Sequence, residues 1–347
     1  MQRRAGTQTV QRSELAVNIS GTLHGADGAV AALREPADAT PSDAVCVLRD
    51  KYLEAALHSN AGVLIVADHQ HLERPHIRVP NVELAWIALL ELFAQRPQPI
   101  GIHPSAVIHP DATLEPDVQI GANVSIAKGA RVGRGSVIGA GSSIGENAVI
   151  GADCQIYENV TIRHHCTLGD RCLIQSGAVI GEDGFGFYRT PDAQHIRQAQ
   201  IGTVTISDDV EVGSNTVIDR GTLTATTIGP RTKIGPTCVI AHNSTVGADV
   251  IMIGAVQLAG SMDIRDKVVL WGQVGSIGHL TIGEGAVVTA QSGISKNVPA
   301  GATWRGSPAQ EIKTQLRLEA RFMALEEMER RLKALEQAIS RRESNGL

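Results

Sequence analysis

The chain has few aromatic residues, no long apolar run and no paired cysteine motif. Aromatic residues make up 3% of its 347 residues, which argues against a core built on large rings. No apolar run approaches the ~18 residues of a membrane span, and no apolar stretch follows the first residues as in a signal peptide. We therefore expect a cytoplasmic protein without a transmembrane segment. A net charge of −5 argues against a general nucleic-acid binder.

A six-residue repeat is the dominant feature of the sequence. From Ile102, every sixth residue through Ile180 is Ile, Leu or Val, and every fifth position of a hexad is small. The register breaks across residues 186–205, resumes at Ile206, and gains four residues at 224–227. From Ile228 it holds for twelve more hexads, in which Ser276 is the one first position without a large aliphatic side chain. Hexapeptide periodicity is the signature of a parallel β-helix.

The period fixes the geometry of this fold. Six residues make one short strand and a bend, and three such units close a triangular coil of about 18 residues. First-position aliphatic side chains point inward and stack on their counterparts one coil away, about 4.8 Å along the axis. Each coil buries its apolar edge only against its neighbours, so the ends of the β-helix need caps.

Four of the five cysteines occupy the fifth slot of the repeat, and no two cysteines form a CxxC pair: Cys154, Cys166, Cys172 and Cys238. That slot holds small residues throughout, so we interpret these thiols as small buried side chains. A metal-binding or thiol-chemistry role is the alternative.

The flanking segments lack the repeat, and three domains are expected: residues 1–100, 101–307 and 308–347. In the first, residues 62–67 read as a buried strand and residues 82–95 as a helix, so a small α/β domain is expected. After Pro308 the chain becomes helical. Leu325, Met328, Leu332, Leu335 and Ile339 recur at spacings of three and four, which indicates a short coiled-coil seam. Self-association around a three-fold axis and packing on the same subunit both fit this seam.

Stacking of coils selects the candidate functional residues. Gly260 stands three hexads, and therefore one full coil, after His242, so its backbone N–H would lie beside a possible base. His279 lies two coils and one residue beyond His242, which suits contact with another part of the same substrate. Once the four inserted residues are removed, Asp219 falls one coil below His242, shifted by one residue. It could orient the imidazole, although on spacing alone a surface salt bridge is the better-supported interpretation of Asp219.

These residues lie within motifs that resemble those of the bacterial UDP-3-O-acylglucosamine N-acyltransferases of lipid A biosynthesis. The resemblance covers nearly the whole chain, and its most specific stretches are Gly181-Glu-Asp-Gly-Phe-Gly-Phe187, Thr216-Val-Ile-Asp-Arg-Gly221, Ile240-Ala-His-Asn243, Gly272-Gln-Val-Gly275 with Gly278-His279, and Gly306-Ser-Pro-Ala309. It implies a homotrimer of left-handed parallel β-helices. It also implies transfer of a (3-hydroxy)acyl chain from acyl carrier protein to the 2-amino group of UDP-3-O-acylglucosamine.

The resemblance also implies roles for individual residues. His242 matches the general base, and Gly260 matches the backbone donor to the oxyanion, a contact whose loss typically costs roughly 10²–10³ in rate. The carboxylate that orients the base in the family is missing from its usual place in this chain, unless Asp219 substitutes for it.

The substrate-binding residues implied are His279 and Asn243 on the β-helix, Tyr52 for the nucleotide, and Lys296 for the phosphopantetheine of the carrier protein. No metal and no resident cofactor are implied. The partners implied are acyl carrier protein, the UDP-sugar and two further copies of the chain.

The chain departs from the family pattern in the nucleotide pocket and beside the base. Where the family has Asp-Asn before the catalytic strand, this chain has Gly235 and Pro236. Cys46 and Arg49 stand where the family has a phenylalanine and an asparagine, and Trp271 stands where a glycine is common. A divergent enzyme with the family's substrate and a relative acting on another amine both fit these departures.

Three further functions remain open from the residues alone. A γ-type carbonic anhydrase shares the fold, but position 284, five residues after His279, is a glutamate and completes no zinc-binding histidine pair. A sugar-nucleotide N-acetyltransferase that uses acetyl-CoA is the second. The third is a non-catalytic β-helix scaffold, against which the intact stretch Ile240–Asn243 and Gly260 argue.

Overall fold

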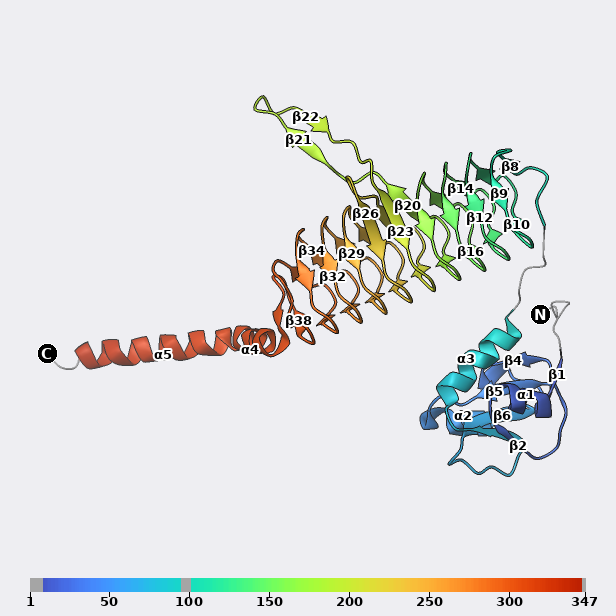
Figure 1. Ribbon diagram of the computed structural model, residues 1–347. Helices are drawn as coiled ribbons and strands as arrows, with labels where there is room; N and C mark the ends of the chain where they lie inside the picture. The colour runs from blue at the N-terminus through green and yellow to red at the C-terminus, as the bar shows by residue number, and fades with distance from the viewer. Residues whose placement is uncertain (1–8, 95–100, 345–347) are drawn as a thin grey trace. The chain divides into compact units, whose positions relative to one another are not determined.

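The computed structural model describes residues 9–94 and 101–344. The chain divides into two compact units, residues 1–98 and 99–347. The first is a small α/β domain, and the second holds the β-helix and the C-terminal helices (Figure 1). No helix in the described ranges is both long and apolar enough to cross a membrane.

The N-terminal domain is a five-stranded sheet in the order β2-β7-β6-β5-β4, with a separate antiparallel pair β1-β3. The strand predicted at 62–67 corresponds to β6, which begins at Val63, and the helix predicted at 82–95 corresponds to α3, which ends at Phe93. Residue 95 lies outside the described residues. The strands of the N-terminal domain are β1 (Val10–Gln11), β2 (Thr22–His24), β3 (Ala29–Val30), β4 (Ala32–Leu33), β5 (Asp43–Cys46), β6 (Val63–Ala67) and β7 (His76–Val79). Its helices are α1 (Arg12–Asn18), η1 (Pro36–Asp38), η2 (Asp50–Tyr52), α2 (Leu53–Leu57) and α3 (Val82–Phe93).

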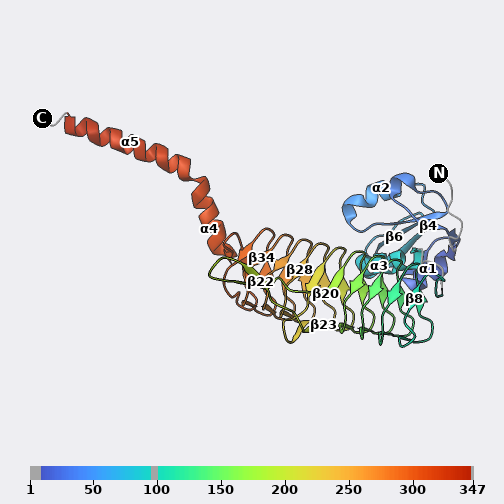
Figure 2. The same cartoon turned by 90° about the horizontal axis from the view of Figure 1, so that it is seen from above.

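The β-helix has three parallel sheets, one for each side of the triangular coil (Figure 2). We name them the first, second and third sheets.

The first sheet contains β10 (Gln119–Ile120), β13 (Val137–Ile138), β16 (Gln155–Ile156), β19 (Leu173–Ile174), β24 (Glu211–Val212), β27 (Lys233–Ile234), β30 (Ile251–Met252), β33 (Val269–Leu270), β36 (Val287–Val288), β38 (Thr303–Arg305) and the antiparallel β39 (Gln310–Glu311). The second contains β8 (Val107–Ile108), β11 (Ser125–Ile126), β14 (Ser143–Ile144), β17 (Thr161–Ile162), β20 (Val179–Glu182), β25 (Val217–Asp219), β28 (Val239–Ile240), β31 (Gln257–Leu258), β34 (Gly275–Ser276) and β37 (Gly293–Ile294). The third contains β9 (Thr113–Leu114), β12 (Arg131–Val132), β15 (Val149–Ile150), β18 (Thr167–Leu168), β23 (Thr203–Ile206), β26 (Ala225–Ile228), β29 (Thr245–Val246), β32 (Asp263–Ile264) and β35 (Thr281–Ile282).

The strand register confirms the hexapeptide reading. Ile126 pairs with Ile144, which stands three hexads further along the chain. Leu168 pairs with Ile206 across the first break in the repeat, and Ile206 pairs with Ile228 across the four extra residues, so both insertions loop out and the stacking continues. The first break contains a hairpin, β21 (Phe187–Arg189) and β22 (His195–Arg197), that projects from the prism (Figure 1).

The core is the continuous stack of first-position and fifth-position side chains inside the prism. Most are completely buried, including all four cysteines of the fifth slot, as the small-residue interpretation predicts. Fourth-position residues take a left-handed backbone in many turns, for example Asn243 with φ 60°. Asn, Asp and Gly tolerate this conformation best, which explains their frequency at that position. Ile102, in the first coil, is 53% exposed because no coil lies beneath it in the described part of the chain.

Two helices follow the last coil, α4 (Ile312–Met323) and α5 (Leu325–Ser344). The α4 helix begins after Glu311, whose side chain accepts a hydrogen bond from the N–H of Thr314, and it packs on β38 and β39. Every side chain from 321 to 340 is exposed. The helical tail expected after Pro308 is therefore present.

Candidate active site

The candidate residues lie in one column along an edge of the second sheet. Strands β25, β28, β31, β34 and β37 pair in register, so residues two positions after each paired Ile218, Ile240, Leu258, Ser276 and Ile294 stack on one another. The stacked residues are Arg220, His242, Gly260, Gly278 and Lys296. Above the buried Arg220 lie a histidine, two glycines and a lysine, in that order, at intervals of about 4.8 Å.

His242 and Gly260 are in direct contact across the two coils. A Cβ atom added to Gly260 would lie 2.5 Å from Cε1 and 2.7 Å from Nε2 of His242. The imidazole therefore occupies the space that any larger residue at 260 would need. The carbonyl of Gly260 accepts a hydrogen bond from the N–H of His279 (3.1 Å), whereas its own N–H has no hydrogen-bond partner among the described residues. That N–H is free to bind an oxygen of a ligand beside the ring.

Asn243 sets the tautomer of His242. Its Oδ1 lies 3.1 Å from Nδ1 of His242 and also accepts hydrogen bonds from the N–H (3.1 Å) and Oγ1 (3.0 Å) of Thr222. Because the Thr222 N–H fixes the amide oxygen at this position, Nδ1 of His242 must be the protonated nitrogen. Nε2, on the side of Gly260, then carries the lone pair that a general base requires. Asn243, which was expected to bind substrate, contacts His242.

The segment before the hairpin covers the other face of His242. A Cβ atom added to Gly184 would lie 2.8 Å from both Cβ and Cδ2 of the histidine. Gly184 is buried, whereas the next residue, Phe185, is 87% exposed. The Phe185 ring packs against Phe187 at a centroid distance of 4.9 Å. His242 therefore lies between two glycine backbones, and the glycine before the hairpin is followed directly by an exposed aromatic pair.

Three arginines hold Asp183, the residue before Gly184. Its carboxylate lies 3.0 Å from Arg197 on the hairpin, 3.7 Å from Arg220 and 3.9 Å from Arg163. The Arg220 side chain is 1% exposed and donates hydrogen bonds from Nε to the carbonyl of Gly181 (2.8 Å) and from Nη1 to that of Gly202 (3.2 Å). This buried cation fixes both ends of the insertion to the prism and thereby the position of Gly184.

His164 is a hydrogen-bond acceptor for the buried arginine. Its Nε2 lies 2.6 Å from Nη1 of Arg220. Burial lowers the pKa of His164, and the positive charge of Arg220 lowers it further. A neutral ring can accept this bond whereas an imidazolium cannot, so His164 belongs to the support of the insertion.

Asp219 is buried beneath His242. Asp219 is 8% exposed and makes no ion pair within 4.0 Å among the described residues. The surface salt bridge that spacing alone favoured for Asp219 is therefore wrong. Burial raises the pKa of Asp219 to about 6, and nearby Glu182 and Asp183 raise it as well. The charge of His242 and its backbone N–H act in the opposite direction. A carboxyl close to His242 therefore sits below the proposed base, in a desolvated position.

The remaining candidate residues of the β-helix are farther from His242. His279 is exposed, one residue past Gly278 in the column. Lys296 is exposed three coils above His242, about 14 Å along the axis, and its ammonium lies 6.0 Å from the ring centroid of Trp304.

Tyr52 belongs to a cavity inside the N-terminal domain. The cavity has a volume of about 600 Å³ and is lined by β5 and the residues after it, by η1 and α2, and by one face of α3. Tyr52, Trp86 and Cys46 contribute to its wall, and Arg34 and Asp38 supply charge. Burial, followed by the charge of Glu83, raises the pKa of the Cys46 thiol to about 12. The cavity therefore offers two aromatic rings and a neutral thiol to a planar ligand.

Sequence reasoning missed Gly184, Asp183, Arg220 and Thr222 as parts of this site. Arg220 stands at the same position of its hexad as His242, so the column itself could have revealed it. Asp183 and Gly184 follow a shift in strand pairing between Ile180 and Glu182, so the hexad count alone could not place them. The described residues contain no group of three or more His, Cys, Asp or Glu side chains placed to hold a metal ion.

Comparison with solved structures finds a similar fold in another protein. A UDP-N-acetylglucosamine acyltransferase from Arabidopsis superposes with a TM-score of 0.56 and 24% identity over 60% of this chain and 73% of the other. The family described as GMPPB C-terminal domain matches residues 97–183.

Sequence comparison gives closer relatives over a shorter stretch. A UDP-3-O-acylglucosamine N-acyltransferase of Methylobacterium nodulans is 46% identical over 145 residues, 42% of this chain and 41% of its own. A protein of the same name from Rhizobium meliloti is 39% identical over 161 residues, 46% of this chain and 45% of its own. Several homologues at 41–46% identity carry this name. The matches span less than half the length of these curated relatives.

Proposed function

We propose that this protein is an N-acyltransferase that moves a (3-hydroxy)acyl chain from acyl carrier protein to the 2-amino group of UDP-3-O-acylglucosamine, a step of lipid A biosynthesis. Relatives that match 42–46% of this chain are named UDP-3-O-acylglucosamine N-acyltransferase, which supports the proposal. The active form is a cytoplasmic homotrimer, and acyl carrier protein and the UDP-sugar are its partners. No metal or bound cofactor takes part, because the phosphopantetheine arm arrives with the carrier protein.

One observation carries the proposal: Nε2 of His242 lies against Gly260, whose N–H has no hydrogen-bond partner among the described residues. In acyl transfer from a thioester, the amine nitrogen attacks the carbonyl carbon while Nε2 takes a proton from that nitrogen. The N–H of Gly260 stabilises the negative charge that develops on the carbonyl oxygen. The C–S bond then breaks, and the leaving thiolate takes the proton from the imidazolium. Asp219, beneath the ring, favours the charged imidazolium that forms during the reaction.

The column above His242 accommodates the two substrates. His279 stands one coil above Gly260 and would contact the nucleotide sugar, while Lys296 would meet the phosphate of the phosphopantetheine arm. Tyr52 would contact the nucleotide from the N-terminal domain. Asn243 acts through His242 as a positioning residue.

A related acceptor is the second candidate function, and the N-terminal cavity favours it. Cys46 lies in the cavity wall where the resembling family has a phenylalanine, and Trp86 supplies an aromatic ring from α3 instead. An amine of another nucleotide sugar fits the same catalytic pair. Binding of UDP-N-acetylglucosamine, measured by calorimetry, separates the two candidates. Binding that weakens in Tyr52→Ala supports the lipid A precursor, and absence of binding by the parent chain supports another acceptor.

The test of the catalytic assignment is His242→Ala, assayed with acyl carrier protein loaded with a 3-hydroxyacyl chain. We expect acyl transfer to be abolished while the thermal transition is nearly unchanged, because His242 is only half-buried. His109→Ala is the matched control, since that histidine is exposed on the first coil. Equal activity in His242→Ala and the parent would place the site elsewhere.

A further inference from the structure

Basic side chains gather on the N-terminal domain at one edge of its sheet. The edge strand β2 pairs with β7 in antiparallel register, and His24 stands opposite His76. Two residues away along this pair, Thr22 stands opposite Arg78. Ile77, between the two polar residues of β7, belongs to the buried core of the domain. Because side chains alternate between the two faces of a sheet, the four polar residues share the opposite face.

Arg78 connects the histidines of this face. Its Nε donates a hydrogen bond to Nε2 of His24 (2.8 Å), and its Nη1 lies 3.1 Å from Nδ1 of His71, in the segment before β7. The ring of His24 stacks on that of His76 at a centroid distance of 4.9 Å. We call these four residues, His24, His71, His76 and Arg78, the histidine cluster.

No carboxylate neutralises the histidine cluster in the described part of the chain. The hydrogen-bond partners of the Arg78 guanidinium are two imidazoles. Desolvation lowers the pKa of His24, and the charges of the other three members lower it further. A protonated His24 would also lose the hydrogen bond from Arg78, since an imidazolium accepts none. The cluster therefore combines one permanent cation with three groups that become cations in acid, and it lacks an anion.

The histidine cluster is open to solvent and has unused donors. His71 and Thr22 are exposed, and His24 and Arg78 are half-buried. Nη2 of Arg78 has no hydrogen-bond partner among the described residues. The Thr22 side chain lies beside it, because directly opposed residues of an antiparallel pair have Cβ atoms about 5 Å apart. A guanidinium with free N–H groups, a hydroxyl and imidazoles are groups that bind phosphate oxygens.

The histidine cluster is separate from the cavity that Tyr52 lines. The sheet order β2-β7-β6-β5-β4 places the cluster on β2 and β7, at one edge. The cavity is lined by β5 and the residues after it, on the other side of β6. A ligand of the cluster therefore does not occupy the position proposed for the nucleotide.

We propose that the histidine cluster is a binding site for a doubly charged oxyanion, the phosphate group of inorganic phosphate or of a phosphate monoester. The anion accepts hydrogen bonds from the guanidinium of Arg78 and from the rings of His24 and His71, which take up protons as it binds. The negative charge favours the imidazolium forms, so binding and protonation strengthen each other. The site does not depend on acyl transfer.

The first arm of the test is calorimetry of the full-length chain with sulfate at low ionic strength. Sulfate stays doubly charged between about pH 6 and about pH 8, so a change in its affinity reports the titration of the protein. We expect binding roughly tenfold tighter at about pH 6 than at about pH 8, because histidines titrate in this range. Equal affinity at the two pH values would overturn the proposal.

The second arm assigns the binding to the cluster. Arg78→Gln should weaken sulfate binding at least about tenfold, because it removes the permanent cation. His71→Asn should weaken binding about threefold at about pH 6 and little at about pH 8, since asparagine takes up no proton. His71 is exposed, so this variant carries the test if the thermal transition shows that Arg78→Gln does not fold.

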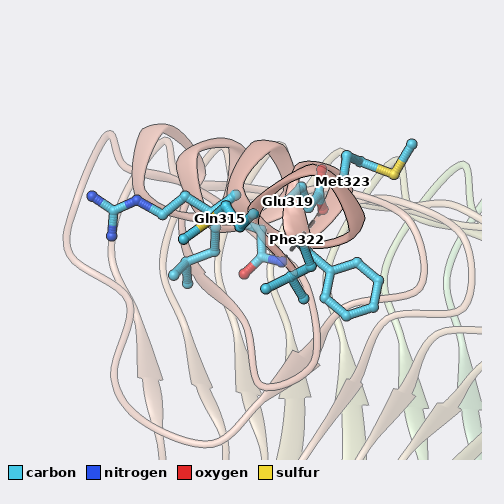
Figure 3. A pocket seen from close by; sticks show the side chains of 8 residues that line it. Gln315, Glu319, Phe322 and Met323 are labelled. Carbon is cyan, nitrogen blue, oxygen red and sulfur yellow. Dashed lines mark hydrogen bonds between the residues drawn. The ribbon is translucent and has the colours of Figure 1, made fainter. Parts of the chain in front are cut away.

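Arg321→Gln is the control for the loss of one positive charge. Arg321 lines the open and mainly apolar hollow at the bend between α4 and α5, whose lining residues include no histidine (Figure 3). This variant should bind sulfate as the parent does. Sulfate binding that is equal in Arg78→Gln and the parent, or that falls equally in Arg78→Gln and Arg321→Gln, would show that the anion lies elsewhere.

The third arm identifies the source of the phosphate group. Inorganic phosphate and glycerol 3-phosphate replace sulfate, and tighter binding of one of them assigns the site to the free anion or to a monoester. UDP-N-acetylglucosamine is the competitor. It should leave sulfate binding unchanged, and displacement of sulfate would overturn the proposal because the anion would then occupy the nucleotide site.

Discussion

Replacing the buried carboxyl of Asp219 by an amide should stabilise the fold at neutral pH and have little effect in acid. Burial raises the pKa of Asp219 from 3.8 to about 6. The folded state therefore holds this proton more tightly than the unfolded state, and stability falls as pH rises from about 4 to about 6. Above that window the full cost of a desolvated charge is present. Below it, the carboxyl is neutral in both states and the cost disappears.

The size of the effect follows from the shift. A displacement of about two pKa units corresponds to about 3 kcal/mol, and the residue is too buried for solvent to screen it strongly. Asn has the same shape, and its Oδ1 can keep the hydrogen bond from the backbone N–H of His242. Asp219→Asn should therefore raise the free energy of unfolding by up to about 3 kcal/mol at about pH 8 and by almost nothing at about pH 3.5.

Urea unfolding of the parent and the variant at the two pH values, at one protein concentration, measures this difference. Asp209→Asn is a control of opposite sign. Hydrogen bonding to Arg171 lowers the pKa of Asp209 below its ordinary 3.8, so removing its charge should lower stability at the higher pH. The loss should shrink only as the pH falls below 3.8, through the lowered pKa of the folded state. An Asp219→Asn variant that is equally destabilised at both pH values would refute the reasoning, because the charge would then not be the source of the cost.

Three further substitutions test the site and the prism. Gly260→Ala puts a methyl group where the His242 ring lies. The rate of acyl transfer should therefore fall by about 10²-fold, with little change in the urea midpoint. An unchanged kcat would show that the contact between Gly260 and His242 is not needed for catalysis. Asp183→Asn should weaken the contact with Arg197 of the hairpin, detected as faster proteolytic cleavage between residues 187 and 197 and a lower kcat, with Asp183→Glu restoring part of both. A hairpin as resistant as in the parent would show that the carboxylate of Asp183 does not hold it. Ile150→Asp buries an unpaired charge inside the prism and should cost more than about 3 kcal/mol of folding stability, measured by urea unfolding. The control Ile150→Val should cost about 1 kcal/mol. Similar losses of stability in the two variants would contradict a dry interior.

The linear regularity of the repeat made much of the fold readable from sequence. Every sixth residue faces the interior, so the first-position aliphatics, the buried cysteines and the coil register all follow from the order of residues. The same arithmetic brought Gly260 above His242, because three hexads make one turn of the prism. The hexad count also placed Asp219 below His242, but it could not tell a buried carboxyl from an exposed one.

Tertiary structure decided what the repeat does not encode. The strand pairing leaves the hexad register between Ile180 and Glu182, ahead of the insertion, so only the fold could show that Gly184 lies against His242 and that Asp183 is held by three arginines. The left-handed backbone of Asn243 is a local property of the turn. Its contact with Nδ1 of His242, in contrast, depends on Thr222 from the neighbouring coil. Local periodicity determines which side chains point into the prism. The surroundings of His242 depend on contacts between residues that no period relates.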